Sequence, residues 1–180
     1  MDKLDYAIKD VEHAFRQLEF AIKLMCYCEL GHIDIEKFDT DITILLQNEN
    51  VGFNAGGFEK DSIIMTSQML VGTAFGVSAI VIDALYDAAG IKKNIKSREP
   101  KDDLQILVYM VRCAFAHNIA APVWDARGPD FAREFYLPLT PEANVDLSQI
   151  NGVSFDYEHI GGFAQWYKIK DAVIHAVRGT

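Results

Sequence analysis

Arg112 and His117 are the two residues of this chain whose types and spacing could do chemistry. They stand at either end of the stretch Arg112-Cys113-Ala114-Phe115-Ala116-His117, which is followed by Asn118. Arginine keeps its positive charge throughout the physiological pH range, whereas histidine exchanges a proton near neutral pH. Together they can stabilise a developing anion while a proton is moved, which is the combination that cleavage of a phosphoester needs.

The same two residues also suit a purely structural role, which predicts that they lie apart and on no shared cleft. Both fall in the last turn of a predicted helix, where positive side chains meet the negative end of the helix dipole. On an ideal helix, five residues correspond to about 140° of rotation, so Arg112 and His117 do not lie on one face. They could converge only if the helix loosens near Asn118 or if a second chain contributes to the site.

Three long helices are predicted to position this segment. The first carries a heptad seam, ends near Gly31 and contains about 27 residues; the seam is Leu4, Ile8, Val11, Phe15, Leu18, Ile22 and Met25. The second runs from about Asp61 to Ala89 and ends at Gly90. It is apolar nearly all round between Met69 and Ile82, so we expect it to be the buried central element.

Two glycines of the second helix, Gly72 and Gly76, stand four residues apart and predict close packing of another helix. The third helix should begin near Pro100, with Asp102 and Asp103 at the positive end of its dipole. Its core stripe contains Leu104, Leu107, Val108, Val111 and Phe115. A second, more polar stripe meets solvent, a ligand or a partner chain and contains Gln105, Tyr109, Arg112 and Ala116.

Beyond the third helix the composition changes to proline, glycine and short apolar runs. Glu134 to Leu137 and Val153 to Tyr157 are predicted strands, and Asn151-Gly152 suits the turn of a hairpin. A last helix follows Gly161-Gly162. The sequence therefore predicts a mainly α fold: an up-and-down bundle of four to five helices in a single domain over residues 1–180, with a small β excursion at about 132–159.

Charge limits the partners of this chain. The net charge of −9 excludes a surface that is basic all over, as a general nucleic-acid binder would need. One local basic patch contains Lys92, Lys93, Lys96, Arg98 and Lys101. A solvated loop between helices is the favoured interpretation of this patch, and contact with RNA is the alternative. We interpret the acidic group of Asp34, Glu36, Asp39 and Asp41 as a solvated face rather than a catalytic pair.

We interpret Trp124 and Trp166 as core residues, with stacking on nucleic-acid bases as the alternative.

Three cysteines, an odd number, indicate free thiols in a reducing compartment, so we expect a cytoplasmic protein. The amino terminus has no secretory pattern, and the most apolar run, Met69 to Ile82, is too short to span a bilayer. The histidines have no metal-ligand spacing, so we expect neither a metal nor a cofactor.

An arginine followed by a histidine after four residues, in a helix preceded by two long helices, resembles the motif and helix order of the HEPN family. The detailed similarity covers about Tyr109 to Pro122. The resemblance implies a homodimer whose motif helices face each other across a twofold axis, bringing two Arg112 and two His117 into one shared site. Tyr109, Cys113 and Asn118 would be auxiliary residues; Cys113 stands where the family commonly has a polar residue, often Asn.

Two functions follow from this resemblance. The first is a metal-independent endoribonuclease, related to toxins or to defence and paired with an antitoxin protein, which cleaves RNA through attack of the 2′-hydroxyl. The second is a non-catalytic module of the same fold that binds nucleotides or proteins.

Overall fold

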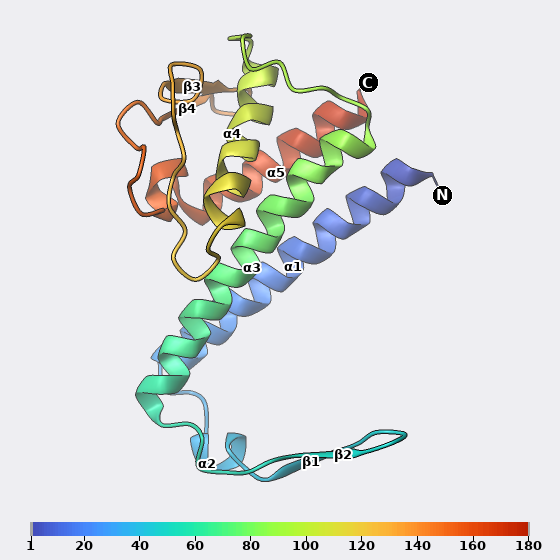
Figure 1. Cartoon of the computed structure of the whole chain (residues 1–180), viewed down its shortest axis with the longest axis vertical. Helices are drawn as coiled ribbons and strands as arrows, with labels where there is room; N and C mark the ends of the chain where they lie inside the picture. The colour runs from blue at the N-terminus through green and yellow to red at the C-terminus, as the bar shows by residue number, and fades with distance from the viewer. Residues whose placement is uncertain (1, 180) are drawn as a thin grey trace. The chain divides into compact units, whose positions relative to one another are not determined.

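The computed structural model describes residues 2–179, and within them the chain is mainly α-helical (Figure 1). The long helices are α1 (Lys3–Glu29), α3 (Lys60–Ala88), α4 (Pro100–Ala116) and α5 (Gly162–Arg178). The short elements are α2 (Ile35–Phe38), β1 (Ile42–Leu45), β2 (Asn50–Phe53), β3 (Glu134–Leu137), β4 (Ala143–Asp146) and the 3-10 helix η1 (Tyr157–Ile160). The predicted mainly α fold, with a small hairpin before the last helix, is confirmed.

The long helices begin and end close to the predicted residues because their ends carry clear local signals. Gly31 and Gly90 follow α1 and α3 with φ of 70° and 72°, a left-handed conformation that ends a helix and that glycine adopts without strain. Pro100 begins α4, where its missing N–H costs no helical hydrogen bond.

The chain was expected to form a single domain, and its contacts divide it into two compact units. The first unit contains residues 2–17 and 72–179, and the second contains residues 18–71. Helices α1 and α3 each contribute to both units. The predicted motif helix, α4, belongs entirely to the first unit.

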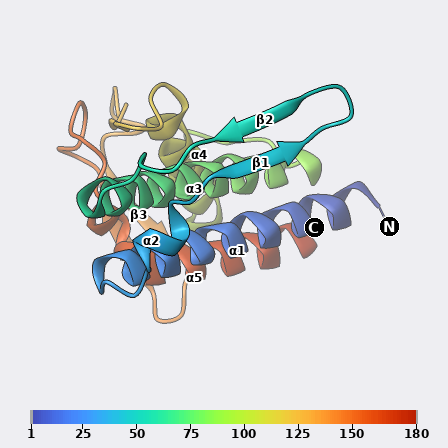
Figure 2. The same cartoon turned by 90° about the horizontal axis from the view of Figure 1, so that it is seen from below.

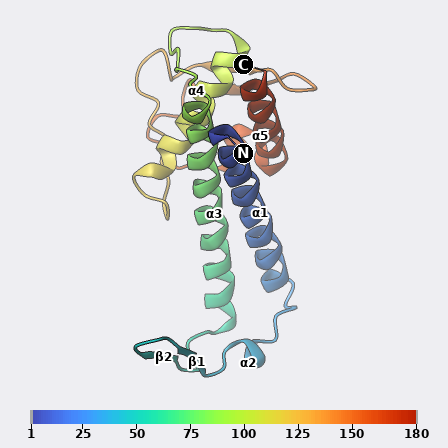
Figure 3. The same cartoon turned by 90° about the vertical axis from the view of Figure 1, so that its right-hand side faces the viewer.

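An aromatic cluster forms the core of the first unit. Phe75 of α3 packs against Phe115 of α4 and Trp166 of α5, with ring centroids 5.3 Å and 5.0 Å apart. The Trp166 indole also donates a hydrogen bond of 2.9 Å to the Ser78 hydroxyl. Both tryptophans are buried, so their interpretation as core residues is confirmed. Helices α4 and α5 are in contact in this unit. Figure 3 draws both in the upper part of its view, α5 in red.

Strands β3 and β4 form an antiparallel hairpin against α4, with Phe135 opposite Val145. Asp103 joins the hairpin to the helix: its carboxylate accepts from the Arg133 guanidinium at 2.6 Å and from the Tyr136 backbone N–H at 2.9 Å. Its side chain is fully buried. Asp103 was expected to interact favourably with the positive end of the helix dipole. Its buried carboxylate also binds the β3–β4 hairpin to α4.

The prediction of a second strand at Val153 to Tyr157 is wrong. Within it only Ser154 forms an isolated bridge, to Val123, and the chain then enters η1, which the Asp156 side chain caps. Asn151-Gly152 makes a turn but not the turn of a hairpin, because its hydrogen bonds join it to the segment after α4. Gly152 N donates to Trp124 O, and Asn151 Oδ1 accepts from Ala126 N. The true partner of β3 is β4, which begins after the Pro-rich stretch.

The predicted close packing at the two glycines of α3 holds at one of them. A Cβ atom at Gly76 would lie 2.8 Å from the Phe115 ring and 3.2 Å from Ile119. A Cβ atom at Gly72 would meet only the Tyr157 hydroxyl, at 3.9 Å. Gly76 is therefore the glycine that lets α3 approach the end of the motif helix.

The second unit contains α2, the hairpin of β1 and β2, and the adjoining ends of α1 and α3 (Figure 2). Asp39 Oδ2 accepts from the backbone N–H groups of Gly56 and Phe58, and Asp41 Oδ1 accepts from Ala55 N at 2.7 Å. These carboxylates had been interpreted as part of a solvated face. They also hold the loop that follows β2.

Helix α3 is long and apolar enough to cross a membrane by length and composition, although its apolar run was expected to be too short. However, 56% of its most apolar window is buried inside the protein. That degree of burial is typical of the core helix of a water-soluble protein, which passes the same test.

Candidate functional site

The open face of α4 carries the residues of the predicted motif. Tyr109, Arg112 and Cys113 are partly exposed, and Ala116 is exposed. Their spacing of three and four residues places them on one stripe of the helix. Gln105 was expected on this stripe but is buried, and its side-chain amide is 3.4 Å from the Ile91 carbonyl oxygen.

Arg112 lies beside a carboxylate from a neighbouring helix. Its side chain is 41% exposed, and its Nε lies 3.9 Å from Oδ2 of Asp83, a residue of α3 whose side chain is only 9% exposed. The other carboxylate oxygen of Asp83 accepts a hydrogen bond of 3.2 Å from Lys93 Nζ. One largely buried carboxylate thus holds two cations beside the motif helix, where the low local dielectric strengthens their attraction.

Tyr109 and Cys113 complete this group. The Lys93 ammonium lies 4.4 Å from the centre of the Tyr109 ring, a cation–π contact. A hydrogen bond with the Cys113 thiol, and the charge of that thiol when ionised, raise the pKa of the Tyr109 hydroxyl. Tyr109 is therefore a neutral hydrogen-bonding group at physiological pH. The Cys113 sulfur also lies 3.9 Å from Arg112 Nη1.

A cavity of about 250 Å³ opens beside these residues. It is lined by Tyr109, Met110, Cys113, Asp125, Arg127 and Phe131. Arg127 donates two hydrogen bonds of 2.6 Å to the Asp125 carboxylate. This pairing is the main reason that the pKa of Asp125 lies below its usual value, and the positive form of His117 contributes to the lowering.

His117 ends the motif helix as its exposed C-cap residue. Its backbone, with φ of −91° and ψ of −35°, is still helical, so the helix does not loosen before it. The rotation of about 140° between Arg112 and His117 is therefore kept. Within residues 2–179, no hydrogen bond or ion pair joins the two side chains. His117 instead lies within electrostatic range of Asp125.

Asn118, a predicted auxiliary residue, shapes the backbone. Its side-chain oxygen accepts hydrogen bonds from Ala120 N at 3.1 Å and Ala121 N at 3.2 Å. Such a turn is a common use of asparagine after a helix. Asn118 thus fixes the direction in which the chain leaves the motif helix.

The predicted basic patch is divided among three acidic partners, one of which is Glu99, paired with Lys101 at 3.0 Å. Lys96 and Arg98 both pair with Asp130, at 2.5 Å and 3.1 Å, and Lys93 pairs with Asp83. Lys92 is exposed. Lys93 is thus the patch residue that the fold brings to Arg112, whereas Lys96 and Arg98 belong to a separate ion-pair cluster.

Three charged residues of this region were missed in the sequence: Asp83, Asp125 and Arg127. Asp83 ends the long apolar run of α3, and a lone carboxylate in such a run signals a buried partner. Asp125 and Arg127 follow a buried tryptophan at a spacing of two, a pattern with no distinctive signal.

Comparison with protein-family models, with curated proteins and with solved structures finds no match to this chain.

Proposed function

We propose that this protein is a metal-independent endoribonuclease of the HEPN type, which acts in the cytoplasm as a homodimer with a shared site. The observation that carries the proposal is the setting of Arg112: a half-exposed guanidinium, 3.9 Å from the largely buried Asp83, on the open face of α4. His117 is exposed at the end of the same helix. A toxin or defence role, with an antitoxin protein as partner, is part of this proposal.

The chemistry needs a base, an acid and a cation. Neutral His117 removes the proton of the 2′-hydroxyl, and the 2′-oxygen forms a bond to the adjacent phosphorus. The bond from phosphorus to the 5′-oxygen breaks, and the protonated imidazole of a second His117, from the other subunit, gives that oxygen a proton. Arg112 donates paired hydrogen bonds to the non-bridging oxygens as their charge grows. The products are a 2′,3′-cyclic phosphate and a 5′-hydroxyl.

A second subunit is needed because one helix cannot aim both groups at the same phosphate. The helical backbone through His117 keeps the two side chains on different arcs of α4. The exposed stripe of Tyr109, Cys113 and Ala116 offers a face on which a second motif helix can pack. Across a twofold axis, the partner's His117 can then approach the Arg112 of the first subunit.

RNA contacts fall to the cations nearest this stripe. Lys93 lies over Tyr109 and beside Arg112's partner Asp83, and Lys92 precedes it in the same exposed segment. Lys96 and Arg98 are farther along the segment and pair with Asp130, not with the carboxylate beside Arg112. We therefore assign the main phosphate contacts to Arg112, Lys92 and Lys93.

A second candidate function is a non-catalytic nucleotide-binding or protein-interaction module of the same fold. The cavity beside the motif favours it, because Tyr109 and Phe131 offer aromatic faces to a base and Arg127 offers a cation to a phosphate. Cys113 favours it too, since a thiol is a poorer hydrogen-bond donor than the amide common at this position of the family.

One experiment separates these functions. Single-stranded RNA is incubated with the protein in excess chelator, and cleavage is compared among the parent chain, Arg112→Ala, His117→Ala and the control His175→Ala, which changes an exposed histidine of α5. We expect cleavage to fall about 100-fold or more in the first two variants and to be unchanged in the control. Products should end in a cyclic phosphate.

Cleavage that survives both motif variants would refute the assignment of the site. No cleavage by the parent chain, together with saturable nucleotide binding that Arg112→Ala weakens, would favour the binding module. Analytical ultracentrifugation of the parent chain tests the dimer, and a monomer at assay concentrations would rule out the shared site.

A further inference from the structure

The second unit exposes far more apolar surface than a self-sufficient structure needs. Only six of its 54 residues are buried: Leu18, Ala21, Cys28, Ile63, Ser67 and Val71. It contains 13 of the 20 large apolar side chains that are exposed in the described chain: Phe20, Tyr27, Leu30, Phe38, Ile42, Ile44, Leu45, Leu46, Phe53, Phe58, Met65, Met69 and Leu70. Exposed apolar residues gathered in this way mark an interaction surface.

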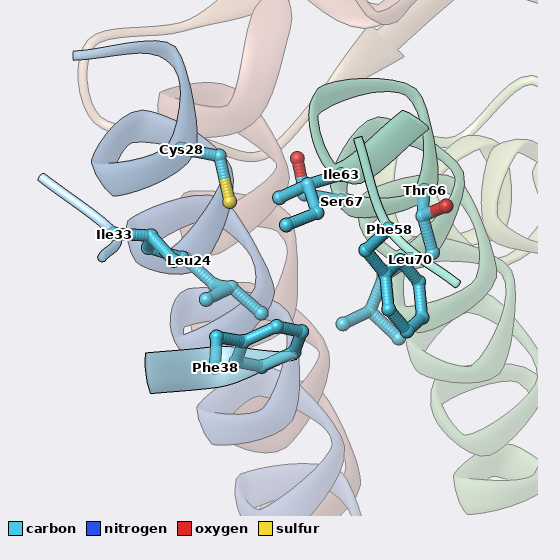
Figure 4. Close-up of a pocket in the computed structure, with 9 residues that line it drawn as sticks. All are labelled: Leu24, Cys28, Ile33, Phe38, Phe58, Ile63, Thr66, Ser67 and Leu70. Atoms are coloured by element: carbon cyan, nitrogen blue, oxygen red, sulfur yellow. The ribbon is translucent and has the colours of Figure 1, made fainter. Parts of the chain in front are cut away.

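A pocket lies within this unit, between the ends of α1 and α3. Figure 4 shows Leu24, Cys28 and Phe38 facing Ile63, Ser67 and Leu70 across it. The rings of Phe38 and Phe58 meet edge to face, with centroids 5.7 Å apart. Both rings and Leu70 are exposed as well as lining the pocket, so they form its rim.

The lining of the pocket is apolar and offers no unsatisfied polar group to a ligand. The Ser67 hydroxyl is already satisfied, because it donates to the Ile64 carbonyl of its own helix at 2.7 Å. An apolar cavity stays dry and gains most from an apolar guest. Its volume of about 220 Å³ is smaller than the 300–1,000 Å³ typical of small-molecule sites, and it suits a single large side chain.

Charge decides among the possible occupants. Residues 18–71 contain nine Asp and Glu against three Lys, a net charge of −6 out of −9 for the whole chain. Two copies of this face would repel each other, and so would this face and the anionic surface of a membrane. A positively charged partner is attracted instead.

We propose that this pocket is a docking site for a basic peptide segment of another protein, which inserts one large apolar side chain, Phe, Leu or Trp, between Phe38, Phe58 and Leu70. The apolar side chain supplies affinity by filling the pocket, and the flanking Lys or Arg residues supply orientation and rate of association. This surface lies in residues 18–71 and does not depend on the proposed ribonuclease site.

The test uses synthetic nine-residue peptides with a central Phe, Leu or Trp flanked by lysines, labelled for fluorescence anisotropy. Two matched sets carry either glutamates in place of the lysines or serine in place of the central residue. We expect saturable binding of at least one lysine peptide, weakened about tenfold or more by either change. Added salt should weaken it further, since most of the acidic side chains in residues 18–71 are exposed.

Two variants locate the binding. Ser67→Leu fills the pocket from α3 and should weaken the best peptide about tenfold or more. Gln68→Leu places a leucine on the next residue, outside the pocket, where it removes only a hydrogen bond to Glu29, and it should leave binding unchanged. Circular dichroism checks that both variants keep the parent's helix content.

Three results would overturn the proposal. The first is that no lysine peptide binds at about 1 mM, and the second is that Ser67→Leu and Gln68→Leu behave alike. The third is a different occupant: self-association, or binding of phosphatidylserine vesicles, that Ser67→Leu abolishes and Gln68→Leu preserves.

Discussion

At the scale of single residues, Asp83 decides how the motif arginine is presented. It interacts with both Lys93 and Arg112 while its own side chain is nearly buried. A buried carboxylate is stable only with such partners, and the partners are in turn held by it. The proposed site therefore depends on a residue outside the motif, which lies beside the Arg112 guanidinium.

We predict that Asp83→Asn destabilises the protein by about 1–3 kcal/mol, because two partly buried cations lose their common anion. Urea unfolding measures this change. The control is Asp87→Asn, an exposed carboxylate one turn later on α3, which should change stability by less than about 0.5 kcal/mol. Equal effects of the two changes would contradict the role given to Asp83. If the ribonuclease proposal holds, Asp83→Asn should also lower cleavage.

At the scale of elements, two contacts fix α4 in the first unit. Asp103 ties its first turn to the β3–β4 hairpin, where the Arg133 guanidinium also lies 4.0 Å from the centre of the Phe135 ring. Gly76 of α3 lets the last turn, with Phe115, pack closely. The motif helix is thus anchored at both ends, and its exposed stripe is left free between them.

For the first contact, we predict that Asp103→Ala costs about 3–5 kcal/mol, because it leaves the Arg133 guanidinium, whose side chain is 11% exposed, without its anion. The adjacent Asp102, in the same turn but partly exposed, is the matched control. Asp102→Ala should cost about 1 kcal/mol or less, the loss of a favourable charge at a helix start. Chemical denaturation compares the two, and similar losses would show that Asp103 acts only through the helix dipole.

For the second contact, we predict that Gly76→Ala destabilises the protein by about 1–3 kcal/mol, since the new methyl group must displace the Phe115 ring and Ile119. Gly72→Ala on the same helix makes only an ordinary contact with the Tyr157 hydroxyl, at 3.9 Å, and should be neutral or stabilising by about 0.5–1 kcal/mol, as expected for alanine in a helix. Thermal unfolding of both variants distinguishes packing from helix propensity. A stabilising Gly76→Ala would contradict the close approach of α3 and Phe115.

At the scale of the whole molecule, the two units differ in how much they bury. The first contains the aromatic core around Phe75, whereas all four residues of β1 in the second are exposed. Local stability follows the number of buried apolar contacts, so the units should open independently. An unfilled surface on the second unit is consistent with the docking site proposed for it.

We predict that hydrogen exchange distinguishes the units. Amides of residues 42–53 should exchange within seconds at neutral pH, because the hairpin of β1 and β2 has no buried face, whereas amides in the middle of α4 should be protected about 1,000-fold or more. Mass spectrometry of peptic fragments measures both in one experiment. Similar protection of the hairpin and α4 would show that the second unit is stabilised by contacts that its burial does not reveal.

The sequence by itself determined the elements whose signals are local. The bounds of α1, α3 and α4 follow from apolar periodicity, from Gly31 and Gly90, and from Pro100, and β3 follows from its own short apolar run. The Arg112 and His117 pair was also visible, because residue type and spacing are properties of the chain alone.

Only the tertiary structure decided which distant groups meet. Val153 to Tyr157 has the composition of a strand, but a strand needs a partner, and the available one lies elsewhere. In the same way, Asp83 and Lys93 approach Arg112 only because close packing at Gly76 and the loop after α3 bring them there. Pairing, burial and charge neutralisation depend on residues remote in sequence, and for that reason local patterns cannot predict them.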